Sequence, residues 1–173
     1  MRADARRNRE RIVTCALGLF AEHGPGVGME DIAREAGLGV GTLYRHFPDR
    51  RALVEEIATG ALRCLVTRIR LLTAQDRPRW DVLTDVVAYC TGQPLALIKS
   101  LADGGPVPGD REALQKEVDG LLRELVEQTR HEGGLRRDIG SAEVAEILST
   151  TVCRPGARPD DAHTRVVLDG LRA

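Results

Sequence analysis

The sequence predicts an all-α fold of about nine helices. Apolar residues recur at the three- and four-residue spacing that places them on one face of a helix, whereas no segment alternates apolar and polar residues as a strand does. Aromatic residues make up only 3% of the chain, so the core must consist mainly of Leu, Val, Ile and Ala, which favours packed helices over a β-sandwich. A length of 173 residues suits one compact unit or two small ones.

Two helices are expected in the N-terminal part of the chain. The first is predicted to begin at a cap formed by Asn8 and to end at Gly24, since glycine followed by proline is typical of a helix C-terminus. The second is predicted to begin near Met29 and to end at Gly37. Residues 1–8 are interpreted as a frayed basic tail, with a minor-groove arm as the alternative.

A third helix is predicted from about Val40 to His46. Leu43 lies at the spacing of an inward anchor, and Pro48 ends the helix because it forces Phe47 out of helical geometry. Residues 29–47 thus form two short helices joined by a glycine turn, the pattern of a helix-turn-helix. In that motif the first helix crosses the DNA backbone and the second lies in the major groove.

A long fourth helix follows, with Asp49 as its N-cap. Its apolar stripe consists of Leu53, Ile57, Ala61, Leu65 and Ile69. A helix of about 24 residues spans about 36 Å, enough to connect an N-terminal head, residues 1–52, to a C-terminal body, residues 53–173. Five further helices are predicted in the body, near 80–90, 95–101, 114–126, 141–148 and 166–171, with Ser141 as cap of the eighth and loops at 103–109 and 154–159.

The third helix carries the chemistry expected of a DNA reader. Gly39 and Gly41 leave its first turn nearly bare, which allows the backbone to approach DNA closely. Its hydrogen-bonding side chains for phosphate oxygens are Thr42, Tyr44 and His46. Arg45 is long enough to reach guanine or phosphate. Arg50 opens the next helix, where a cation opposes the helix dipole, so a functional partner such as phosphate is expected for it.

Residues 9–55 resemble the DNA-binding head of the TetR family of bacterial transcriptional regulators. The resemblance is carried by Asp31-Ile32-Ala33, Gly41-Thr42-Leu43-Tyr44 and His46-Phe47, among other positions. It implies DNA contact by Thr42, Tyr44, His46 and Arg50. With the bare first turn and the positions that vary within the family, the predicted DNA-binding set is Gly39, Val40, Gly41, Thr42, Tyr44, Arg45, His46 and Arg50. A lysine usually stands at the position of Arg50 in this family, and the residues matching Val40 and Arg45 help to select the sequence. Glycines at 28 and 39 replace the usual Ser or Thr caps, so a slightly looser head is expected.

The resemblance implies a homodimeric transcriptional repressor that is not an enzyme. A cytoplasmic location is expected because the four cysteines form no CxxC pair and no secretory segment is apparent. Two third helices would lie in successive major grooves, about 34 Å apart, on a palindromic double-stranded DNA operator. A small-molecule effector would bind the body and change the spacing of the heads. The candidate ligand pocket comprises Cys64, Trp80, Tyr89 and Cys90, although Trp80 and Tyr89 suit simple core filling equally well. No cofactor and no membrane partner are expected.

Composition limits the alternatives. A net charge of −1 argues against a uniformly basic nucleic-acid binder, and no apolar run reaches the roughly 18 residues of a membrane span. The four cysteines form no CxxC pair, and the histidines show no metal-ligand spacing, so no metal site is expected.

Three rival hypotheses remain open. The cysteines allow a thiol-based redox switch on the same scaffold. The glycines at 37, 39 and 41 resemble part of a nucleotide-binding loop but lack its third glycine and its preceding strand, so an enzyme is the weaker rival. The last is a helical interaction module that has lost DNA binding.

Overall fold

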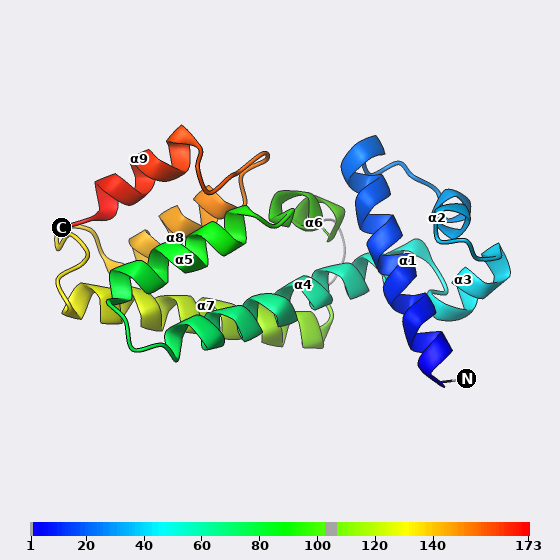
Figure 1. Cartoon of the computed structure of the whole chain (residues 1–173), viewed down its shortest axis with the longest axis horizontal. Helices are drawn as coiled ribbons and strands as arrows, with labels where there is room; N and C mark the ends of the chain where they lie inside the picture. The colour runs from blue at the N-terminus through cyan, green and yellow to red at the C-terminus, as the bar shows by residue number, and fades with distance from the viewer. Residues whose placement is uncertain (1, 103–106) are drawn as a thin grey trace.

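A group of three helices at one end of the molecule is joined by one long helix to a larger helical bundle (Figure 1). The computed structural model describes residues 2–102 and 107–173, and within these it contains nine α-helices and no β-strand. The helices are α1 (Arg2–His23), α2 (Met29–Glu35), α3 (Val40–His46), α4 (Arg50–Thr73), α5 (Arg79–Thr91), α6 (Leu95–Ala102), α7 (Gly109–His131), α8 (Ser141–Val152) and α9 (Ala162–Leu171). The predicted all-α class is thereby confirmed. Of the loop predicted at 103–109, residues 103–106 lie outside the described residues.

The first helix begins earlier than the sequence suggested. It starts at Arg2, so the prediction of a frayed tail capped by Asn8 is wrong. Arg6 and Glu10 form an ion pair of 2.9 Å one turn apart, and pairs of this spacing stabilise an exposed helix. The helix ends at Gly24 as predicted, where φ is +79°, a conformation that favours glycine.

The three N-terminal helices share one hydrophobic cluster, here called the head cluster. Its fully or almost fully buried members include Ile12, Phe20, Ile32, Leu43 and Phe47. Phe47 has extended φ and ψ of −137° and 102°, which ends α3 before Pro48 as predicted. Leu43, the predicted inward anchor, has no exposed surface.

Helix α4 belongs to two hydrophobic clusters at once. Asp49 caps it as predicted, since its carboxylate accepts a hydrogen bond of 2.8 Å from the Ala52 amide. The first turns, as far as Ala58, pack in the head cluster, whereas the part from Leu65 onward packs in a second, body cluster. The head cluster therefore extends beyond residue 52, and it also takes Ile98 from α6.

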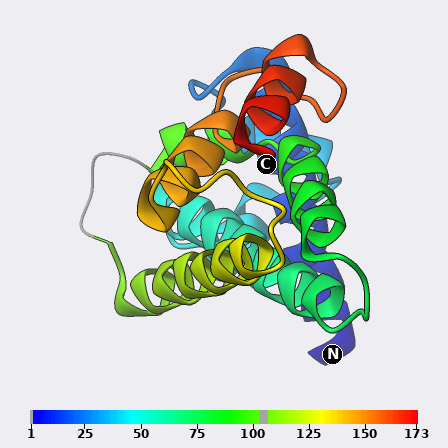
Figure 2. The same ribbon diagram turned by 90° about the vertical axis from the view of Figure 1, so that its left-hand side faces the viewer.

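The body cluster is almost entirely aliphatic and lies between α4, α5, α7, α8 and α9. Viewed from the body end, α9 and α7 lie on opposite sides of the bundle (Figure 2). Ser141 is not the cap of α8 that the sequence predicted. Gly140 takes that position, and its amide donates to the Glu143 carboxylate at 2.8 Å.

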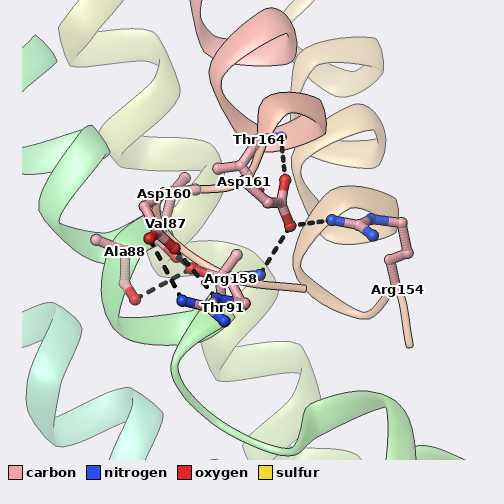
Figure 3. Close-up of polar contacts among 8 residues, drawn as sticks. All are labelled: Val87, Ala88, Thr91, Arg154, Arg158, Asp160, Asp161 and Thr164. Atoms are coloured by element: carbon pink, nitrogen blue, oxygen red, sulfur yellow. Dashed lines mark hydrogen bonds and ion pairs between the residues drawn. The ribbon is translucent and has the colours of Figure 1, made fainter. Parts of the chain in front are cut away.

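The loop between α8 and α9 is organised by Asp161 (Figure 3). Its carboxylate accepts hydrogen bonds from the amides of Thr164, at 2.7 Å, and Arg158, at 2.9 Å, and also binds the Arg154 guanidinium. These amide donors hold the pKa of the Asp161 carboxyl well below its usual range. The loop thus fixes the start of α9.

None of the helices in the described ranges combines the length and apolar character needed to cross a bilayer.

Candidate nucleic-acid interface

Helix α3 packs on the head cluster along one side and is exposed to solvent along the rest of its surface. Leu43 and Phe47 are completely buried and fix the helix on the head cluster. Val40 and Tyr44, which lie one helical turn apart, are 38% and 41% exposed. Arg45 is exposed beside them and has no ion-pair partner among the described residues, so its charge is available to a ligand.

The first turn of α3 carries almost no side-chain bulk. Gly39 is the N-cap, and no side chain caps the helix there. A Cβ added at Gly39 or Gly41 would meet no atom within 4 Å, so both positions open toward solvent. Thr42 and His46 are half-buried at the edges of the exposed face. The structure therefore brings the predicted residues of α3 together on one short, open helix.

Arg50 contacts the loop between α1 and α2. Its guanidinium donates to the Val27 carbonyl at 2.6 Å and to the Pro25 carbonyl, and it lies 4.6 Å from the centroid of the Phe20 ring. It thereby fastens the loop between α1 and α2 to the start of α4. Contact of Arg50 with phosphate stays a prediction, while its contacts in the free protein are all within the head.

Arg9 is a functional candidate that the sequence did not single out. Its guanidinium donates to the His46 carbonyl at 2.9 Å, pairs with the Glu56 carboxylate at 2.6 Å and lies 4.3 Å from the centroid of the Phe47 ring. It thus joins α1, the end of α3 and α4. Its partners lie 37 and 47 residues away, so only the fold identifies it.

The candidate pocket residues separate into three places. Cys64 and Tyr89 line a cavity of about 510 Å³ that lies between α1, α4 and the α5–α6 region. Cys90 is 5% exposed and belongs to the body cluster. Trp80 lies beside Gly134 and Arg172, in a different depression at the far end of the body. The proposed pocket therefore keeps only Cys64 and Tyr89, and the cavity wall adds Val13 and Leu17 from the head.

The cysteines differ in their surroundings. Burial raises the pKa of the Cys90 thiol to about 12 and also raises the pKa of Cys153. Such thiols carry little thiolate at neutral pH and react slowly with oxidants.

In the part of the chain that the structure describes, no three His, Cys, Asp or Glu side chains gather in a way that could hold a metal ion.

The three glycines considered for nucleotide binding have structural positions in the helix-turn-helix. Gly37 ends α2 with a φ of +61°, Gly39 is the N-cap of α3, and Gly41 lies in its first turn. A nucleotide-binding loop of the predicted type follows a strand, whereas the segment before Gly37 is α2. This arrangement removes the support for the enzyme hypothesis.

Comparisons with known proteins agree with this geometry. The sequence profile of the N-terminal region of bacterial regulatory proteins of the TetR family matches residues 12–57. A helix-turn-helix-type transcriptional regulator of Staphylococcus aureus is 37% identical over 90 residues, which cover 51% of this chain and 49% of that protein. The chain thus aligns with about half the length of the curated relatives it matches.

Solved structures match over the whole chain. A TetR transcription regulatory protein from Mycobacterium vanbaalenii is 31% identical, with a TM-score of 0.71 over 99% of both chains. A TetR transcriptional regulator from Streptomyces coelicolor is 32% identical, with a TM-score of 0.63 over 95% of this chain and 98% of that one. A TetR-family regulator from Agrobacterium tumefaciens, at 21% identity and a TM-score of 0.80 over 98% of this chain and 100% of that one, shares the fold.

Proposed function

Because the chain belongs to the TetR family of bacterial regulatory proteins, we propose that it is a cytoplasmic, homodimeric transcriptional repressor. It binds a palindromic double-stranded operator through α3 and releases it when a small molecule binds. The observation that supports this best is the exposure of Val40, Tyr44 and Arg45 on a helix whose other face is fixed by Leu43 and Phe47.

The exposed and half-buried positions of α3 fall into three groups by their proposed role. Tyr44, Thr42 and His46 donate hydrogen bonds to phosphate oxygens and position the helix. Arg45 and Val40 contact base edges in the major groove, where a guanidinium suits guanine and an aliphatic side chain suits the thymine methyl group. Gly39 and Gly41 let the backbone approach the DNA strand closely.

A second copy of the chain is needed to read a palindrome, and α8 and α9 are the proposed contact. These helices have 12 and 10 residues, and Val166 on α9 is 69% exposed. Val166→Arg is expected to shift the protein from dimer to monomer in sedimentation, since it introduces two like charges at a two-fold contact. If the variant remained dimeric, the contact would lie on another surface.

The effector hypothesis is supported by the cavity beside Cys64 and Tyr89. Its volume of about 510 Å³ lies within the range of about 300–1,000 Å³ typical of small-molecule sites. The redox hypothesis has weaker support, since burial raises the pKa of both Cys90 and Cys153.

The test is selection of fragmented genomic DNA on the purified protein at moderate salt, followed by sequencing. Enrichment of a palindrome, which Tyr44→Ala weakens, is the expected result. Binding that depends on salt but not on sequence would contradict the proposal, because phosphate attraction alone produces that behaviour.

A further inference from the structure

The cavity lies where the head cluster and the body cluster separate. Leu17 on α1 packs against the head cluster, Leu65 on α4 belongs to the body cluster, and both line the cavity. Figure 1 shows α1, the first half of α4 and α6 meeting at this junction. A molecule in the cavity would therefore touch both halves of the protein.

Arg9, which contacts the end of α3, lines this cavity together with its partner Glu56. The Arg9 guanidinium bonds to the His46 carbonyl at the end of α3 and to the Glu56 carboxylate on α4. Carbonyl groups in the last turn of a helix lack partners within the helix, so Arg9 satisfies a group that would otherwise depend on water. Arg9 and Glu56 are 39% and 32% exposed as side chains, so their pair is accessible from the cavity.

Gly60 makes room beside this pair. It lies one helical turn after Glu56 on α4 and lines the cavity. A Cβ added there would meet no atom within 4 Å. Side chains on a helix tilt toward its N-terminus, so the space that a side chain at position 60 would fill lies toward Glu56. A ligand can occupy this space because Gly60 has no side chain.

The charges of the wall indicate the class of ligand. Arg6 pairs with Glu10 at 2.9 Å and Arg9 pairs with Glu56 at 2.6 Å, so the four charges cancel. A charged ligand would lose its own water without meeting an unpaired charge of opposite sign on this wall, which is costly. A neutral ligand avoids that cost, and it gains from burial against the aliphatic wall. Tyr89 and Gln93 also line the cavity, and their hydroxyl and amide groups suit one or two hydroxyl or carbonyl groups on such a ligand.

We propose that this cavity binds a neutral, mainly apolar small molecule, and that the ligand weakens operator binding by loosening Arg9 from Glu56 and the His46 carbonyl. Arg9 is thus a positioning residue for α3. The coupling to the operator rests on the proposed function, whereas the ligand site does not. Linkage requires that operator DNA weaken ligand binding by the same factor by which the ligand weakens operator binding.

The site is tested first without DNA. Nile red, a neutral apolar fluorophore, is titrated into the wild type and into Gly60→Leu and Gly60→Ala, alongside the anionic fluorophore anilinonaphthalene sulfonate. Gly60→Leu is expected to lower Nile red affinity at least tenfold, whereas Gly60→Ala, which removes the same helix-destabilising glycine but fills little space, retains most of it. Equal affinity of Gly60→Leu and wild type would overturn the site, and tighter binding of the anionic probe would overturn the neutral class.

The coupling is then tested by hydrogen exchange and operator binding. Nile red should speed amide exchange at His46 and Phe47 in the wild type, whereas in Arg9→Gln exchange there is already fast and the probe adds little. With the selected operator, saturating Nile red should raise the wild-type Kd about fivefold or more, and this ratio should fall to about twofold or less in Arg9→Gln. Arg9→Lys should show an intermediate ratio, since one ammonium group cannot reproduce both bonds.

Arg70→Gln is the matched control. Arg70 and Glu117 form an ion pair between α4 and α7 with the same N–O distance of 2.6 Å, away from α3 and the cavity. In Arg70→Gln, the ratio of the operator Kd with saturating Nile red to the Kd without it should equal that of the wild type. If Nile red raised the operator Kd of Arg9→Gln as much as that of the wild type, the positioning role of Arg9 would be overturned. The proposed function as a DNA-binding regulator would be unaffected. If no operator were found, the proposed function would fail, while the probe titration and the amide exchange at His46 and Phe47 would still decide the ligand site and its link to α3.

Discussion

The head and the body are held together in different ways. Both phenylalanines of the chain, Phe20 and Phe47, are buried in the head, and each lies beneath an arginine that also bonds to main-chain carbonyl groups. The body core is aliphatic, and its aromatic side chains Trp80 and Tyr89 are half-buried beneath exposed arginines. Directed contacts fix the position of α3, whereas aliphatic packing tolerates rearrangement around a ligand.

The largest expected effect comes from removing a ring of the head. Phe47→Ala should lower the free energy of unfolding by about 3–5 kcal/mol and also weaken operator binding, since the ring is buried beneath Arg9. Leu83→Ala, in the body core, should cost about 2–5 kcal/mol but leave the operator affinity of the folded protein unchanged. Urea unfolding and fluorescence anisotropy measure the two quantities. An equal loss of affinity in both variants would remove the distinction between the two regions.

A smaller effect is expected when the exposed face of α3 is changed. Tyr44→Ala should lower operator affinity by about 1.5–3 kcal/mol, the worth of one hydrogen bond to a charged group. Its free energy of unfolding should change by about 0.5 kcal/mol or less, since the side chain is 41% exposed. Leu71→Ala is the control, because Leu71 is an exposed apolar side chain of the body, at 57%. A loss of stability without a loss of affinity would mean that Tyr44 serves the core.

Arg50 tests whether a head contact serves the fold, the DNA or both. Arg50→Gln should lower the free energy of unfolding by about 1.5 kcal/mol, because it breaks the bonds to the Val27 and Pro25 carbonyls. The slope of log affinity against log salt decides the second role. An unchanged slope confines Arg50 to the head, whereas a slope smaller by about 1 would establish the phosphate contact that the sequence predicts.

The smallest effect is expected at the cap of α3. Gly39→Ser should raise the free energy of unfolding by a few tenths of a kcal/mol, because serine can accept a hydrogen bond from an amide of the first turn. The backbone at Gly39, with φ of −66° and ψ of 142°, suits serine, and an added Cβ meets no atom within 4 Å. Urea unfolding measured on duplicate preparations resolves this change. If Gly39→Ser lowered the free energy of unfolding, a side chain at the first turn of α3 would be destabilising, contrary to this expectation.

The sequence predicts the head well because the decisive signals there are local. Gly24, Gly37 and Pro48 end helices, Asp49 caps one, and each acts within a few residues of its own position. The end of α3 and the start of α4 follow from these signals alone. The start of α1 was missed because exposed ion pairs extend the helix without any apolar periodicity.

The functional contacts of Arg9 could not be predicted in the same way. In the sequence it is one of several arginines near the N-terminus, and nothing local separates it from Arg6 or Arg11. Its role depends on two partners that only the packing of α1 against α3 and α4 brings near. The predicted pocket was wrong in part because the sequence does not show which residues the packing brings together. Trp80 and Tyr89 lie nine residues apart on α5 and reach different ends of the body.

The shared helix α4 determines how this protein could be recombined with its relatives. Residues up to Ala58 complete the head cluster, and Ile98 from α6 closes it. A chimera joined after residue 52 would therefore leave Phe20 and Leu43 facing foreign side chains. Exchange of operator specificity is better achieved by grafting the exposed positions of α3 alone, because Val40, Tyr44 and Arg45 can change without disturbing either core.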